Sequence, residues 1–208
     1  MTAKIKSPER LVFFSDAVVA IALTLLILPL ADVVKDYGTR GAKLDTNNSY
    51  NLIASHLPLI YAFLLSFVVI IRFWFSHHRI FEHVRAYSTP LLIVNMLWVL
   101  SIVFLPFPTE MVANFGGGDR LTHIVYGGNL FMSSVLLTTL VWIIRRDPEV
   151  RREGDETFSD RRWFDAVTTS GSIGVATLLM AIFPSWSYYP LLLGVLQPQL
   201  VRLRFRSH

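Results

Sequence analysis

One carboxylate lies inside an apolar stretch near the start of the chain. Residues 10–30 read RLVFFSDAVVAIALTLLILPL, and Asp16 stands within this run, directly after Ser15. A carboxylate in the hydrocarbon region of a membrane costs at least about 2.5–3.5 kcal/mol on insertion scales, so such a residue usually has buried partners or a role in transport. Asp16 is therefore the first candidate functional residue.

Donors that can satisfy a buried carboxylate occur at a matching depth in two later apolar runs. Trp74 and His77 lie near the end of one run, and Asn95 and Trp98 lie near the start of the next. Indole, imidazole and amide N–H groups are all donors. We therefore predict a polar network that joins three helices near one membrane surface. Its members are Arg10, which snorkels at the edge, Ser15, Asp16, Trp74, His77, Asn95 and Trp98.

Three interpretations of Asp16 stay open at this point. It is a member of a structural network, a proton-relay or ion-binding carboxylate, or a partner of the helix N-terminal dipole. His77, His78 and His83 also raise the question of a metal site. The spacing of His77 and His83 does not place them on one helix face, so we expect neither a metal nor another cofactor.

A helical wheel separates two unlike faces of the first apolar run. With about 100° per residue, Thr24, Leu25 and Leu28 fall within about 60° of Ile21, whereas Asp16 lies on the opposite side, near 220°. One face is a ladder of aliphatic side chains with a single hydroxyl. The other face carries the acid.

The composition places these residues in a membrane protein. Of the 208 residues 53% are hydrophobic and 16% are charged, against about 25% charged in average soluble domains, and the mean hydropathy is +0.49. We predict an all-α integral membrane protein with one domain, residues 1–208. Its six spans are expected near 8–31, 52–80, 88–112, 121–145, 161–183 and 187–203. The chain has no cysteine, which excludes disulfides and thiolate sites, and we expect no cleavable signal peptide.

The basic residues predict the orientation. Only Lys35, Arg40, Lys43 and Arg120 fall in the expected outer segments, and the other Lys and Arg residues fall in inner ones. The positive-inside rule then places both termini in the cytoplasm of a multi-pass protein of the cell membrane. The net charge of +4 is explained by this topology, so we expect no nucleic-acid partner.

Several motifs resemble those of one known family. The string from Arg10 through Phe14-Ser15-Asp16 to the run 20–26 (AIALTLL) is similar to the signature of the transmembrane protein 175 family of potassium-permeable channels. The pairs Trp74–His77 and Asn95–Trp98, with the string LPFPT at 105–109, also resemble it. The resemblance covers residues 10–110, and one departure is Ala17, where many members have Gly.

The resemblance implies a homotetramer of six-span chains in which four copies of the first span line a central pore without a carbonyl-loop filter. It implies a hydrophobic constriction at Ile21, with further aliphatic rings at Leu25 and Leu28, and a selectivity layer at Thr24. The seven residues of the predicted polar network match the family's own network. The partners would be further copies of the chain, the bilayer, K⁺ and other monovalent cations.

The expected function is thus a potassium-permeable cation channel and not an enzyme. The main alternative is a proton-coupled carrier or a proton leak pathway that uses Asp16 and His77. A membrane enzyme and a purely structural membrane protein are weaker alternatives, because no nucleophile–base or metal spacing is present.

Overall fold

The described part of the chain is built from helices. The computed structural model describes residues 8–39, 48–115, 118–152, 158–183 and 188, so the sixth predicted span lies almost wholly outside the described residues. The helices are α1 (Glu9–Leu25), α2 (Leu28–Thr39), α3 (Asn48–Ser55), α4 (Leu57–Phe81), α5 (Thr89–Phe104), α6 (Pro106–Phe115), α7 (Arg120–Arg146) and α8 (Phe158–Ile182).

Five stretches of the described residues are long and apolar enough to cross a membrane. They are Glu9–Lys35, Leu57–Phe81, Thr89–Phe115, Arg120–Arg146 and Trp163–Ile182. Each spans at least the 20 or so residues that a 30 Å hydrocarbon layer requires. The fold is therefore that of an all-α, multi-pass membrane protein.

Prolines lie at or next to three breaks between consecutive helices. α1 ends at Leu25 and α2 begins at Leu28, just before Pro29. Pro58 stands in the first turn of α4, and Pro106 begins α6 after a break at Leu105. Proline lacks the N–H that would bond the carbonyl four residues earlier, and its ring clashes with that carbonyl. Each break therefore follows from the sequence.

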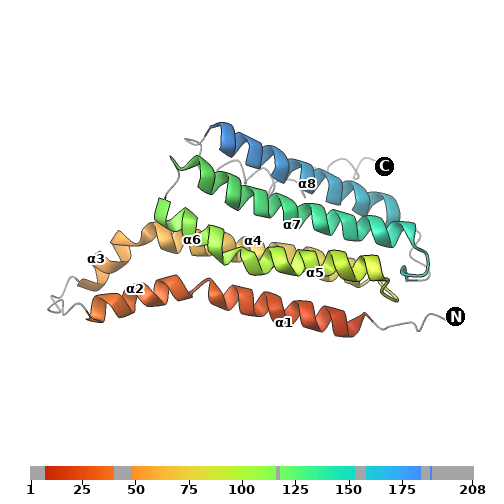
Figure 1. Ribbon diagram of the computed structural model, residues 1–208, viewed down its shortest axis with the longest axis horizontal. Helices are drawn as coiled ribbons and strands as arrows, with labels where there is room; N and C mark the ends of the chain where they lie inside the picture. The colour runs from red at the N-terminus through yellow and green to blue at the C-terminus, as the bar shows by residue number, and fades with distance from the viewer. Residues whose placement is uncertain (1–7, 40–47, 116–117, 153–157, 184–187, 189–208) are drawn as a thin grey trace, which may run out of the picture.

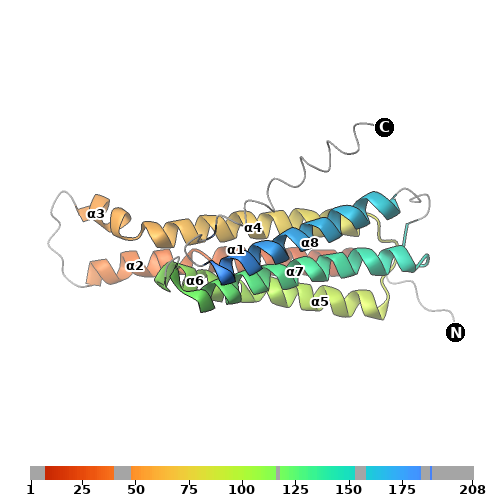
Figure 2. The same cartoon turned by 90° about the horizontal axis from the view of Figure 1, so that it is seen from above.

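The helices stack in layers across the bundle. Figure 1 shows α1 and α2 along one edge, α4 and α5 beside them, then α7, and α8 along the opposite edge. The view from above in Figure 2 separates α4 from α5, with α7 and α8 between them in projection. α1 packs on α4 and α5 alone among the larger helix contacts. Within the described residues, one long side of α1 is therefore not covered by another helix of the same chain.

The first helical stretch is longer than the sequence pattern predicts. The pattern predicts a span that ends near residue 31 and then an aqueous loop with at most a little helix, whereas α2 continues to Thr39. Asp32, Lys35 and Asp36 are polar, yet none of them breaks a helix, and Gly38 is the first poor helix former after Pro29. The polar residues therefore do not mark the end of the helix.

Small and hydroxyl-bearing residues hold α7 against α8. A Cβ on Gly127 would lie 2.9 Å from the side chain of Thr177, and a Cβ on Gly174 would lie 2.8 Å from Phe131. The Thr177 hydroxyl donates to the carbonyl of Gly127 over 3.0 Å. This close approach is the usual way for helices to associate where water provides no driving force.

Candidate functional site

Asp16 has a partner on the neighbouring span. Nε1 of Trp74, on α4, donates a hydrogen bond to Oδ1 of Asp16 over 2.8 Å. Both side chains are partly buried. Indole is a donor only, so it matches an ionised carboxylate, which is an acceptor only. The bond ties the first span to the second at the depth of the acid.

Asn95 of α5 is the centre of the adjoining hydrogen bonds. Its Nδ2 donates to Oγ of Ser15 over 2.9 Å, and its Oδ1 lies 2.7 Å from Nε2 of His77. Ser15 in turn donates to the carbonyl of Leu11 over 3.0 Å. Because Asn95 Oδ1 accepts only, Nε2 of His77 must carry the proton. All three polar side chains are fully buried, and they join α1, α4 and α5.

Aromatic packing fixes the plane of the imidazole. The rings of His77 and Trp98 are stacked at 4.1 Å between centroids, with an interplanar angle of 7°. Phe81 also packs on His77, with 4.4 Å between the ring centroids. Trp98 is fully buried, so it is a core residue of the bundle and not one of an interfacial aromatic belt.

The structure brings together six of the seven residues predicted for the network, in two groups. Asp16 pairs with Trp74, and Ser15, Asn95, His77 and Trp98 form the second group. Arg10 is different: it is exposed, and no hydrogen bond or ion pair joins it to the others within the described residues. Its position in the first turn of α1 and its long side chain place it in the aqueous layer.

The ladder on α1 lies on the uncovered side of the helix. Ile21 is 57% exposed, Leu25 39% and Leu28 50%, and Thr24 is exposed as well. Val19, Ala22 and Leu26 face the bundle instead and are at most 3% exposed. The helical wheel and the packing therefore divide the helix into the same two sides.

The Thr24 hydroxyl is bonded back to its own helix. Oγ1 donates to the carbonyl of Ile21 over 2.7 Å. A hydroxyl has one proton and two lone pairs, so this bond uses the donor and leaves acceptor capacity on the oxygen. The oxygen can therefore act as a ligand for a cation on the uncovered side of α1.

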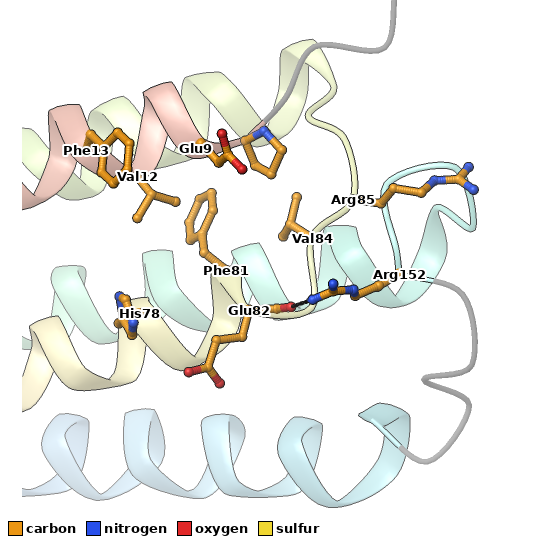
Figure 3. A pocket seen from close by; sticks show the side chains of 10 residues that line it. Glu9, Val12, Phe13, His78, Phe81, Glu82, Val84, Arg85 and Arg152 are labelled. Carbon is orange, nitrogen blue, oxygen red and sulfur yellow. Dashed lines mark hydrogen bonds between the residues drawn. The ribbon is translucent and has the colours of Figure 1, made fainter.

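A cavity of about 510 Å³ opens where α1 begins and α4 ends. Figure 3 shows Glu9, Val12 and Phe13 on one side of it and Phe81 and Val84 on the other. Arg152 reaches the rim from the segment after α7, and its Nη1 lies 3.4 Å from the carbonyl of Glu82. Residues 83–85 also pair with 150–152 through two backbone hydrogen bonds, Arg85 N to Val150 O and Arg152 N to His83 O. The cavity therefore has a fixed wall of backbone.

A second polar group joins the spans farther along the bundle, and sequence reasoning missed it. Oγ of Ser66 lies 2.7 Å from Oγ1 of Thr109 and 3.1 Å from the Tyr126 hydroxyl. All three residues are buried and come from α4, α6 and α7. Hydroxyls are too common in membrane helices to single out by type. The available signal was Ser66 as the one polar residue in an apolar run.

Comparisons with known proteins agree with this architecture. The family model described as endosomal/lysosomal potassium channel TMEM175 matches residues 10–106. A potassium channel of Streptomyces collinus is 32% identical over 149 residues, which are 68% of this chain and 68% of that protein. The endosomal/lysosomal proton channel TMEM175 of Mus musculus is 32% identical over 146 residues, which are 65% of this chain and 29% of the mouse protein.

A solved structure extends the likeness to nearly the whole chain. The crystal structure of a lysosomal potassium-selective channel TMEM175 homolog from Chamaesiphon minutus superposes with a TM-score of 0.71 at 25% identity, covering 94% of this chain and 96% of that one. The chain therefore belongs to the TMEM175 family, and it is an ion-channel protein of the membrane and not an enzyme.

Proposed function

We propose that this chain forms a potassium-permeable cation channel whose pore is lined by the uncovered side of α1 from four copies. One observation carries the proposal: a transmembrane helix at the edge of the bundle exposes Ile21, Thr24, Leu25 and Leu28 while its other side is buried. The bacterial relatives named as potassium channels support the choice of ion.

In this proposal the aliphatic side chains form the constriction. Four copies of Ile21, with Leu25 and Leu28 beyond it, narrow the pore with groups that cannot replace the hydration shell of an ion. Such a ring closes a pore by excluding water. Opening then requires α1 to tilt or rotate so that the Ile21 ring widens. The proline-induced break after Leu25 gives the outer part of the stretch a point about which to move.

Thr24 supplies the oxygen ligands. Since its proton is engaged by the Ile21 carbonyl, the lone pairs are available to a partly dehydrated cation. Four such oxygens at one level give a modest preference among monovalent cations. In this proposal they act without a dedicated filter of backbone carbonyls. K⁺ is then a permeant ion and not a bound cofactor.

The polar network has a bracing role in this proposal. The alternative, a proton pathway through Asp16 and His77, draws support from the name of the mouse relative. Asn95 weighs against it, because an amide interrupts the hydrogen bonds that lead away from His77 and does not itself titrate. Asp16 bonds Trp74 instead of this group, and indole is not a proton carrier at ordinary pH.

The assembly and its placement belong to the same proposal. A homotetramer in the cell membrane, with both termini in the cytoplasm, agrees with the uncovered side of α1 and with the distribution of basic residues. Cross-linking in mild detergent gives the subunit count. Four subunits agree with a central pore made of four α1 helices, whereas a monomer or a dimer contradicts it.

Reconstitution in liposomes tests the function directly. We expect a cation current whose reversal potential follows the K⁺ gradient when Na⁺ is on the opposite side. Ile21→Asn should increase this current, because a polar side chain allows water into the constriction. The absence of cation current, or a current that Ile21→Asn leaves unchanged, contradicts the proposal. Proton flux that Asp16→Asn abolishes in a correctly assembled protein supports the alternative.

A further inference from the structure

A second hollow lies between α7 and α8, away from the proposed pore. It has a volume of about 200 Å³ and lies on the two helices at the opposite edge of the bundle from α1. Trp142 and Trp163 are among its lining residues. The others are Val135, Thr138, Thr139, Val167 and Ser170.

The hydroxyls of this groove have their partners inside the protein. Thr138 Oγ1 lies 2.7 Å from Ser170 Oγ and also bonds the carbonyls of Ser134 and Ala166. Thr139 donates to the carbonyl of Val135 over 2.8 Å. The wall therefore presents methyl groups and aromatic rings and leaves no strong donor for a polar ligand. In a helix pair that crosses the membrane, such a wall fits a hydrocarbon chain.

Two arginines lie over the two tryptophans at the end of the groove. The guanidinium carbon of Arg146 is 4.3 Å from the centre of the Trp142 ring, and that of Arg145 is 5.9 Å from the Trp163 ring. Both arginines belong to the last turn of α7. A guanidinium that lies over a ring face keeps its N–H groups in its own plane, and two of them can bind a phosphate through two parallel hydrogen bonds.

The tryptophans and arginines lie at the depth of the membrane surface. Trp142 is four residues before the end of α7, which is about 6 Å along the helix axis. Tryptophan is enriched at this level, where hydrocarbon meets headgroups. The same end of the bundle is the one that the basic residues predict to face the cytoplasm, whose leaflet carries anionic lipids.

We propose that the α7–α8 groove binds one anionic phospholipid of this leaflet. An acyl chain lies along the groove between Trp142 and Trp163, and the phosphate is bound by Arg145 and Arg146. The positive charge of the two arginines favours an anionic headgroup. Because the hydroxyls of the groove are hydrogen-bonded within the protein, the groove favours a hydrocarbon chain over a polar ligand.

Native mass spectrometry of the full-length protein tests this proposal. The purified protein is exchanged into an equimolar mixture of phosphatidylglycerol and phosphatidylcholine, and the retained lipid is identified. We expect retention of phosphatidylglycerol in preference to phosphatidylcholine. Arg145→Gln/Arg146→Gln should reduce that preference by roughly thirtyfold, since two arginines near an anionic surface together contribute about 2 kcal/mol. Equal retention of both lipids by the unmodified protein overturns the proposal.

Two controls separate the groove from general charge. Arg79→Gln/Arg85→Gln removes the same charge at the same end of the bundle from residues outside the groove and should leave the preference unchanged. Val167→Trp fills the groove and should lower the retention of both lipids. If Val167→Trp binds phosphatidylglycerol as well as the unmodified protein does, the groove is not the site. The same holds if inorganic phosphate alone competes the lipid away, because a hydrocarbon chain then contributes nothing.

Discussion

Nε1 of Trp74 donates to a carboxylate oxygen of Asp16 over 2.8 Å, and this bond joins the second membrane span to the first. It lies on the side of α1 that faces the bundle, behind the ladder that begins at Ile21. Asp16, whose burial in the membrane costs the most free energy in the first span, therefore holds the helix in place. The apolar side of α1 is available for other contacts.

Replacing Trp74 by Phe should destabilise the protein. The change keeps most of the aromatic volume but leaves Asp16 without its indole donor, and a hydrogen bond to a charged group contributes about 1.5–3 kcal/mol. We expect a lower melting temperature in detergent. Phe75→Leu is the matched control, because Phe75 is 51% exposed on the same helix and should shift the melting temperature much less. Equal shifts for both variants argue against a bracing role for the Trp74–Asp16 bond.

Thr24 tests the proposed oxygen ligands. Thr24→Val keeps the shape and removes the oxygen, so the K⁺ over Na⁺ permeability ratio from reversal potentials should fall towards unity. Thr24→Ser keeps the hydroxyl and should preserve most of the ratio. An unchanged ratio in Thr24→Val removes this residue from the selectivity layer.

Neighbouring glycines on α7 should respond differently to the same substitution. Gly127→Ala places a methyl group 2.9 Å from Thr177, and overpacking of this kind costs about 1–3 kcal/mol. Gly128 has no heavy atom within 4 Å of the added carbon, so Gly128→Ala should be neutral or slightly stabilising. Thermal unfolding in one detergent compares the two variants. The account of α7–α8 packing fails if Gly127→Ala is tolerated as well as Gly128→Ala.

The start of α7 predicts a pH dependence of stability. Asp119 is the N-cap, and its carboxylate accepts hydrogen bonds from the hydroxyl and the amide of Thr122, which lower the pKa of Asp119 below its usual value. A lowered pKa in the folded state means that the carboxylate stabilises the protein above the unfolded pKa. This contribution is lost as the pH falls through the folded pKa.

Asp119→Ala should therefore lower the melting temperature at neutral pH and lower it less in acid. Asp119→Asn retains the capping oxygen and removes the titration, so it separates the cap from the charge. A difference between the unmodified protein and Asp119→Ala that stays constant from neutral pH to well below the usual aspartate pKa of about 3.9 contradicts this assignment.

The polar network was predictable because physical chemistry leaves few alternatives. A carboxylate in an apolar helix needs donors, and only a few indole, imidazole and amide groups occur at the right depth. The sequence alone does not show how they pair. Ser15 bonds Asn95 while Asp16 bonds Trp74, which splits the expected single network into two groups. That outcome depends on how α1 is rotated against α4 and α5.

Other features depend on packing that composition does not encode. Arg10 is predicted to snorkel at the edge of the network, and the structure places it exposed in the first turn of α1. The extent of α2 was missed because a solvated helix and a solvated loop share the same polar residues. The contacts of Ser66 and Tyr126 require the fold to bring α4 next to α7. The prolines, in contrast, marked the helix breaks because their effect on the backbone is local.

Cysteine accessibility tests most directly the central claim that the uncovered side of α1 lines the pore. The chain has no cysteine, so a single introduced thiol is the only reactive site. The measurement is the K⁺ current of reconstituted channels before and after a charged, water-soluble thiol reagent. We predict that the reagent blocks Thr24→Cys and Leu28→Cys and leaves Val19→Cys and Ala22→Cys unaffected. Block at the two buried positions, or at none of the four, would contradict a pore lined by this side of α1.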